Sequence, residues 1–181
     1  MILKNDSFKI NLQIKDYTED LLINEKLEYI YNKNIYSTEN CKVIVIEVTS
    51  SIKTLKIGLL CNYDIEEQYH ALLENNILTI LHYDSISKIN INTGELIINK
   101  KMDSCGIGLN IYKLNEDYII HGELEIIMLD SNLNEKWKFS GKDIFVCQSD
   151  KKAFELSDRC IKLYDFMDNY YELDFEGNQV N

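Results

Sequence analysis

Proline is absent from the 181 residues, and glycine occurs only seven times. Tight turns ordinarily use these two residues, so we expect asparagine and aspartate to shape most turns here. No apolar run approaches the roughly 20 residues of a membrane-spanning helix. The N-terminal stretch carries charges every few residues and lacks the apolar segment of a secretion signal. We therefore expect a cytoplasmic protein that does not bind membranes.

Basic residues are scarce: 19 Lys and Arg stand against 30 Asp and Glu, which gives a net charge of −11 at pH 7. Nucleic-acid binding needs basic patches that neutralise phosphates, and anionic lipid surfaces demand the same. The composition therefore excludes both as expected partners. The acidic residues are spread along the chain, which is typical of a solvated surface and also permits a basic protein partner.

Motifs for metal, cofactor or nucleophilic chemistry are also missing. The five cysteines are widely separated and include no C-x-x-C pair, so we expect neither a zinc site nor a disulfide framework. Cys147 and Cys160 lie in apolar stretches, where we expect them to pack as small hydrophobic side chains. The segment 104–108 contains glycines but lacks the lysine of a phosphate-binding loop, and no G-x-S-x-G elbow occurs. No cofactor is expected.

A tandem repeat is what the chain does contain. Three segments share an apolar strand, a polar turn, a second strand that ends in Asp or Asn, another polar turn, and a strand rich in aromatic or aliphatic residues. The segments are residues 77–100, 118–141 and 153–177. The recurring Asp or Asn is Asn90, Asp130 or Asp165; these lie about 40 and about 35 residues apart, the spacing of propeller-type blades. Each copy predicts two or three antiparallel strands.

The recurring Asp or Asn has a predicted structural role. Its side chain can accept a hydrogen bond from the backbone N–H two residues on, which forms an Asx-turn. The turns 92–94 and 132–134 that follow carry residues that tolerate positive φ. Paired carboxylates such as Asp130, Asp165 and Asp168 can also catalyse hydrolysis. The recurrence of Asp130 and Asp165 at one repeat position favours the turn role.

These patterns predict one all-β domain over residues 1–181 with about three to four antiparallel blade-like repeats. Residues 69–103, 107–141 and 144–178 are the expected repeats, and 1–64 hold diverged N-terminal strands, including a hairpin at 42–60. The propeller-like array can be closed or open, and a β-sandwich is the alternative fold. Residues 64–76 fit a helix by apolar spacing, but the repeat register favours a strand at 69–73.

The stretch Leu129-Asp130, a polar turn and Trp137 resembles the repeat of quinoprotein-type β-propellers. Residues 118–145 also resemble a group of small uncharacterised bacterial proteins, and the resemblance extends over about residues 69–180. It implies a propeller-like architecture. No quinone is carried over, because many blade proteins bind none and this chain is too short for the many blades of a quinoprotein.

Two histidines occupy near-equivalent repeat positions. His82 and His121 each end an inner strand, with Asp84 and Glu123 close in sequence. One hypothesis is a shared metal or acid–base site at the rim of the blades, formed by His82, His121 and Glu123. The other is that each histidine forms hydrogen bonds within its own loop. A metal site needs a third ligand, which the sequence does not identify.

The function that fits best is a non-enzymatic protein-binding module, of the immunity or inhibitor type that neutralises a basic toxin or nuclease. Twelve tyrosines suit an interface, although tyrosine also favours strands. The alternatives are a small-molecule or metal-binding protein or enzyme at the blade rim, and a structural component of a larger assembly. Open strand edges would also allow self-association.

Overall fold

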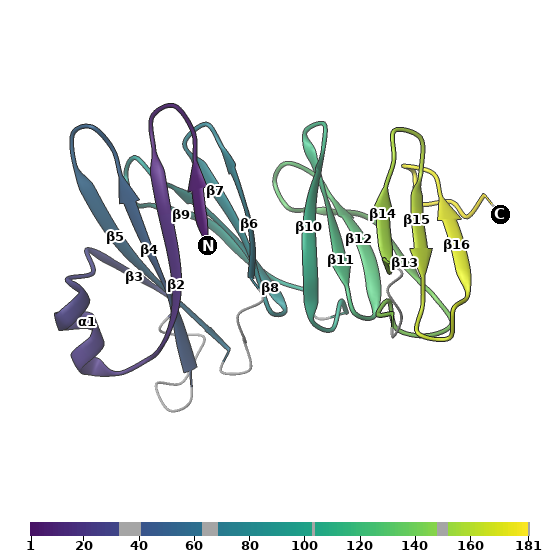
Figure 1. Cartoon of the computed structure of the whole chain (residues 1–181), viewed down its shortest axis with the longest axis horizontal. Helices are drawn as coiled ribbons and strands as arrows, with labels where there is room; N and C mark the ends of the chain where they lie inside the picture. Colours follow the sequence, from purple (N-terminus) through teal and green to yellow (C-terminus); the bar gives the residue numbers. More distant parts are fainter. Residues whose placement is uncertain (33–40, 63–68, 103, 148–151, 181) are drawn as a thin grey trace. The chain divides into compact units, whose positions relative to one another are not determined.

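The computed structural model describes residues 1–32, 41–62, 69–102, 104–147 and 152–180, and almost all of its secondary structure is strand (Figure 1). The predicted all-β, blade-like fold is confirmed. The chain divides into two compact units, Met1–Lys100 and Lys101–Asn181, and each is described by itself. The single domain over residues 1–181 stays a prediction. No helix in the described ranges is long and apolar enough to cross a lipid bilayer.

The first unit begins with a five-stranded sheet. Its order is β1 (Ile2–Lys4), β2 (Lys9–Asp16), β4 (Cys41–Thr49), β5 (Thr54–Asn62) and β3 (Tyr29–Tyr31). The predicted hairpin is confirmed as β4 and β5, which pair antiparallel along their whole length. β3 instead pairs parallel with β5. This sheet is therefore not a simple meander like the repeats.

Helix α1 (Glu19–Glu25) lies between β2 and β3 in the chain. The Thr18 hydroxyl accepts a hydrogen bond from the backbone N–H of Leu21 and so caps the N-terminus. At the other end, the Glu25 carboxylate forms ion pairs with Lys15 of β2 and Lys56 of β5. The helix is thus fastened to the sheet by side chains from two of its strands.

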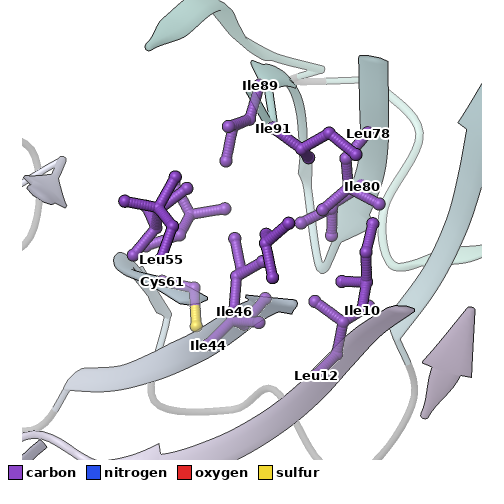
Figure 2. Close-up of a cluster of buried hydrophobic side chains, with 13 residues drawn as sticks. Ile10, Leu12, Ile44, Ile46, Leu55, Cys61, Leu78, Ile80, Ile89 and Ile91 are labelled. Atoms are coloured by element: carbon purple, nitrogen blue, oxygen red, sulfur yellow. The ribbon is translucent and has the colours of Figure 1, made fainter. Parts of the chain in front are cut away.

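A second sheet in the same unit follows the first repeat. β6 (Tyr69–Glu74), β7 (Ile77–His82), β8 (Ser85–Asn90) and β9 (Leu96–Lys101) lie in chain order, as in a propeller blade. The strand predicted at 69–73 is confirmed as β6, whereas residues 63–68 lie outside the described residues. The two sheets share one hydrophobic core, which draws alternate residues from their strands (Figure 2). Those labelled in Figure 2 are Ile10, Leu12, Ile44, Ile46, Leu55, Cys61, Leu78, Ile80, Ile89 and Ile91.

The second unit contains the other two repeats. One sheet has the order β10 (Gly108–Leu114), β11 (Asp117–Gly122), β12 (Glu125–Leu129) and β13 (Glu135–Ser140). The other has the order β14 (Phe154–Leu156), β15 (Ile161–Tyr164) and β16 (Tyr170–Leu173). Both contribute to one core, in which Phe145, from the segment between the sheets, is fully buried.

The cysteines pack largely as expected. All five are free thiols; Cys160 is buried, and Cys147 is half-buried. Cys160 directly precedes β15 and its thiol lies 3.3 Å from the Ser157 hydroxyl. Burial raises the pKa of Cys61 to about 12, so this thiol stays protonated.

Candidate functional site

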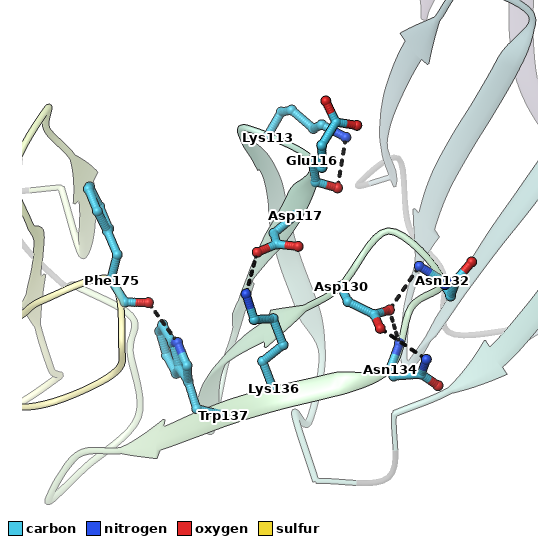
Figure 3. A network of polar contacts seen from close by, with 9 residues as sticks. All are labelled: Lys113, Glu116, Asp117, Asp130, Asn132, Asn134, Lys136, Trp137 and Phe175. Atoms are coloured by element: carbon cyan, nitrogen blue, oxygen red, sulfur yellow. Dashed lines mark hydrogen bonds and ion pairs between the residues drawn. The ribbon is translucent and has the colours of Figure 1, made fainter.

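The turns after the middle strands are built as the sequence predicts. The Asp130 carboxylate accepts hydrogen bonds from the backbone N–H of Asn132 at 2.8 Å and of Asn134 at 2.7 Å (Figure 3). Asp165 accepts the equivalent bonds from Met167 and Asn169. Asn90 accepts a bond from the backbone N–H of Asn92 at 3.0 Å. The predicted bond from the N–H two residues on is confirmed at all three positions.

A further copy of this turn, which the repeat pattern does not predict, follows β16. Asp174 accepts hydrogen bonds from the backbone N–H of Glu176 and Asn178. The pattern that could have revealed it is Asp followed four residues later by Asn, which also describes the turns that begin at Asp130 and Asp165. These carboxylates serve as acceptors that close the turns.

The residue before the final Asn of each turn has a positive φ. It is Leu133 (φ 63°), Asp168 (φ 60°) or Gly177 (φ 85°). Only glycine adopts this conformation without steric cost, so the side-chain bonds of the turn must offset the strain at Leu133. From the sequence, the residues expected to tolerate positive φ in this turn are Asn132 and Asn134, which flank Leu133.

Asp165 has a further structural role because it is buried. Besides the turn amides, its carboxylate accepts a hydrogen bond from the Tyr171 hydroxyl at 2.8 Å. Burial raises the pKa of Asp165, but the hydrogen bonds from Asn169 and Tyr171 outweigh this effect and hold it below its usual range. Tyr171 in turn accepts a bond from the backbone N–H of Lys142. The carboxylate therefore ties its own turn to β16 and to the segment 141–147.

His121 and Glu123 hold the same segment from the other sheet of the second unit. The His121 ring nitrogen Nε2 donates a hydrogen bond to the Phe145 carbonyl at 2.9 Å. The backbone N–H of Phe145 donates to the Glu123 carbonyl at 2.7 Å. The His121 ring also stacks on Phe154, with ring centroids 5.2 Å apart. These contacts place the core residue Phe145 between the two sheets of the unit.

His82 belongs to the first unit, where it is fully buried on the core face of its sheet. Its Nε2 lies 2.9 Å from the Ser87 hydroxyl, which donates to the Asn99 side-chain carbonyl at 2.6 Å. Because Ser87 donates to Asn99, His82 donates from Nε2, and its Nδ1 keeps a lone pair. That buried Nδ1 has no hydrogen-bond partner among the residues that the structure describes. Burial lowers the pKa of His82 to about 4, so the imidazole is neutral at pH 7.

The rim hypothesis needs His82 together with His121 and Glu123. The structure describes His82 in one unit and the other two residues in the second unit, close together in β11 and the turn that follows it. Within the described ranges, no three His, Cys, Asp or Glu side chains gather as ligands for a metal ion. Asp84 accepts a hydrogen bond from the neighbouring Ser85 hydroxyl. A shared site at the blade rim stays a prediction.

Trp137, the other residue that the repeat pattern identifies, connects β13 to the turn that follows β16. Its ring N–H donates to the Phe175 carbonyl at 2.9 Å (Figure 3). The ring lies against Gly177, where an added Cβ would come within 2.6 Å of it. The first unit contains a similar contact: Tyr31 donates to the Gly94 carbonyl, and the Tyr29 ring covers Gly94. In each unit an aromatic side chain thus covers a glycine turn.

Two further features were not visible in the sequence. One is a pair of apolar residues, Phe166 and Met167, exposed on the turn between β15 and β16. The other is a cleft of about 480 Å³ between three turns of the first unit, which we call the turn cleft. It is lined by Asp6, Ser7, Phe8, Val48, Ser50, Ser51, Ile52, Lys53, Leu55, Ile91 and Asn92. Residues from four strand ends meet there, so no single sequence window could have predicted it.

Similarity to known proteins is confined to fold. No protein-family model matches the chain, and no curated protein matches it. BamB from Moraxella catarrhalis is similar in structure, with a TM-score of 0.52 and 12% identity over 79% of this chain and 46% of that one. The computationally designed Ika8 protein has a TM-score of 0.52 and 13% identity, with the same coverage of both chains.

The chain spans about half the length of these solved structures. The structural neighbours are β-propeller-like proteins, which agrees with the three meander sheets described above. At such low identity the likeness concerns the arrangement of strands and carries no activity or ligand to this chain.

Proposed function

We propose that this protein is a non-enzymatic binding module that recognises a basic protein, in the manner of an immunity or inhibitor protein. The observation that carries the proposal is the exposed pair Phe166 and Met167, of which Met167 is 67% exposed. A propeller-like fold fits such a role, because its turns present side chains on a rigid scaffold.

The turn itself does not require either apolar residue. Asp165 and Asn169 supply the side-chain bonds that close it. At the position of Met167, the turn that begins at Asp130 has Asn132, a polar residue. Two adjacent exposed apolar side chains form a small apolar patch, and contact with a partner would remove this patch from water.

The chemistry of the pair suits protein recognition. A turn already fixed by hydrogen bonds loses little conformational entropy on binding. Methionine is polarizable and adapts its shape, which is why it recurs at binding surfaces. Burying such a side chain contributes roughly 1.5–3 kcal/mol, which corresponds to an affinity change of about tenfold or more.

Net charge supports the basic character of the partner. At −11 the chain attracts cationic surfaces and repels other acidic ones, so association is expected to be faster at low salt. The proposal extends to a cytoplasmic location and to one domain over residues 1–181. The proposal also includes a quinoprotein-type repeat that binds no quinone. The contact of Trp137 with the turn at Gly177 supports this type of repeat.

Affinity capture tests the proposal. The tagged chain is exposed to a lysate of its own host at low and at high salt, and bound proteins are identified and quantified. We expect one stoichiometric basic protein that is lost at high salt. Absence of any stoichiometric basic protein at low salt would refute the function.

Two matched variants locate the contact. Met167→Asn gives the turn the residue that its sister turn has, and we expect at least about a tenfold loss of captured partner. Asn132→Ser changes the equivalent position in the sister turn and should leave capture unchanged. Equal capture by both variants would show that the Phe166–Met167 pair is not the contact.

A further inference from the structure

The turn cleft of the first unit opens onto its hydrophobic core. Val48, Leu55 and Ile91 form its floor, and all three are buried members of the core that the two sheets share. The ring of Phe8, which packs on the same core, adds to the lining. The floor can therefore accept an apolar group against buried aliphatic side chains.

Hydrogen bonds within the turns fix the walls of the cleft. The Asn5 side-chain carbonyl accepts bonds from the backbone N–H of Ser7 at 3.0 Å and of Phe8 at 2.9 Å. The Ser50 hydroxyl accepts a bond from the backbone N–H of Lys53 at 3.1 Å. These bonds use Asn5 and Ser50 and leave the other polar side chains at the rim available.

Those available side chains include both signs of charge. Asp6 stands on one turn and Lys53 on another, and neither side chain forms an ion pair or hydrogen bond with the rest of the described chain. The side chains of Ser51 and Asn92 likewise make no hydrogen bond within the described ranges. An asparagine amide presents a donor and an acceptor together, which is the complement of a peptide group.

We propose that the turn cleft binds a short apolar peptide whose two termini are free. The peptide ammonium binds Asp6, its carboxylate binds Lys53, and the side chain of Asn92 pairs with the peptide group between them. Its apolar side chains lie on the floor formed by Val48, Leu55 and Ile91. A volume of about 480 Å³ falls within the range of small-molecule pockets, so a short peptide fits and a single ion does not fill it.

Titration of the full-length chain with leucyl-leucine tests this proposal. Binding is followed by amide chemical shifts, and we expect saturable changes at Ser51, Ile52 and Asn92. The N-acetyl and the C-terminal amide forms of the dipeptide each lack one charge, and each should bind about two to five times more weakly. No saturable shift at millimolar leucyl-leucine, or equal affinity for the free and doubly capped dipeptides, overturns the proposal.

Paired variants assign the two charges. Asp6→Asn should lower the affinity for leucyl-leucine but leave the affinity for the N-acetyl form unchanged. Lys53→Gln should likewise lower the affinity for leucyl-leucine but leave the affinity for the C-terminal amide form unchanged. Lys4→Gln, on an exposed position of the same hairpin outside the cleft, is the matched control. Met167→Asn should leave dipeptide binding intact, so this proposal and the proposed function can fail independently. If Lys4→Gln no longer distinguishes the free dipeptide from its capped forms, the assignment of the two charges to Asp6 and Lys53 is wrong.

Discussion

Replacing His82 with glutamine tests how strongly the burial of this imidazole couples folding to pH. Burial lowers the pKa of His82 from 6.5 to about 4. Between these two values the unfolded chain takes up a proton at His82 and the folded chain does not. The contribution of neutral His82 to the free energy of unfolding is therefore present above pH 6.5. It is lost as the pH drops toward 4, by about 1.4 kcal/mol per pH unit. Over the whole window the loss is about 3 kcal/mol, against the roughly 5–15 kcal/mol of a typical domain.

Glutamine can still donate to the Ser87 hydroxyl, but it does not titrate. The measurement is urea denaturation followed by far-ultraviolet circular dichroism at intervals from pH 7 to pH 4.5. The lower limit avoids carboxylates such as Glu25, whose pKa is lowered from 4.5 and whose contribution is lost only below that pH. We expect His82→Gln to flatten the dependence of unfolding free energy on pH by about one proton.

His70→Gln is the control, because burial also lowers the pKa of His70 in the same unit. That variant should lose only its own smaller contribution and keep the steep dependence due to His82. If wild type and His82→Gln lose the same free energy of unfolding between pH 6.5 and pH 4.5, the reasoning about the buried imidazole is wrong.

Three further predictions concern the turns and the core. Tyr171→Phe removes a donor to buried Asp165 and should cost about 1–2 kcal/mol, measured by urea denaturation with the fluorescence of Trp137. Gly177→Ala puts a Cβ at φ 85° against the Trp137 ring, and this strained backbone should cost about 1 kcal/mol or more. The same assay measures this loss, and an unchanged midpoint of denaturation would contradict the packing. Cys61 should resist alkylation by iodoacetamide at pH 8 in the folded chain and react once urea unfolds it, because burial raises its pKa to about 12; rapid labelling of the native chain would rule this out.

The repeats were predictable because each uses local chemistry. An Asp or Asn at the end of a strand closes the following turn with its own side chain, so Asn90, Asp130 and Asp165 could be assigned from sequence alone. The strand at β6 followed from the repeat register although its apolar spacing also fits a helix. Local rules of this kind do not depend on how the sheets pack.

The burial of His82 was not predicted, yet a signal for it exists. Leu78, Ile80 and His82 alternate along β7 and so point to the same core face. Both hypotheses for His82 instead place it at the rim or in the loop, because it ends its strand. The position of β3 beside β5 could not be predicted, because parallel pairing with a strand more than twenty residues away leaves no local pattern. The turn cleft is hidden from sequence for the same reason.

Function depends on side chains that the fold does not need. Asp130 and Asp165 close turns, and His121 holds the Phe145 backbone, so the structure itself accounts for these groups. The backbone N–H of Met167 takes part in its turn, but its side chain is 67% exposed and belongs to no buried core. This contrast is the reason for our proposal that Met167 contacts a partner.

The dissociation constant of the captured basic protein, measured with the wild-type chain and with Met167→Asn, tests the central claim most directly. The account predicts at least about a tenfold weaker complex for the variant, with an unchanged free energy of unfolding of the chain alone. It also predicts that both complexes weaken as salt rises. Equal dissociation constants for the two chains, or a partner that binds regardless of salt, would contradict it.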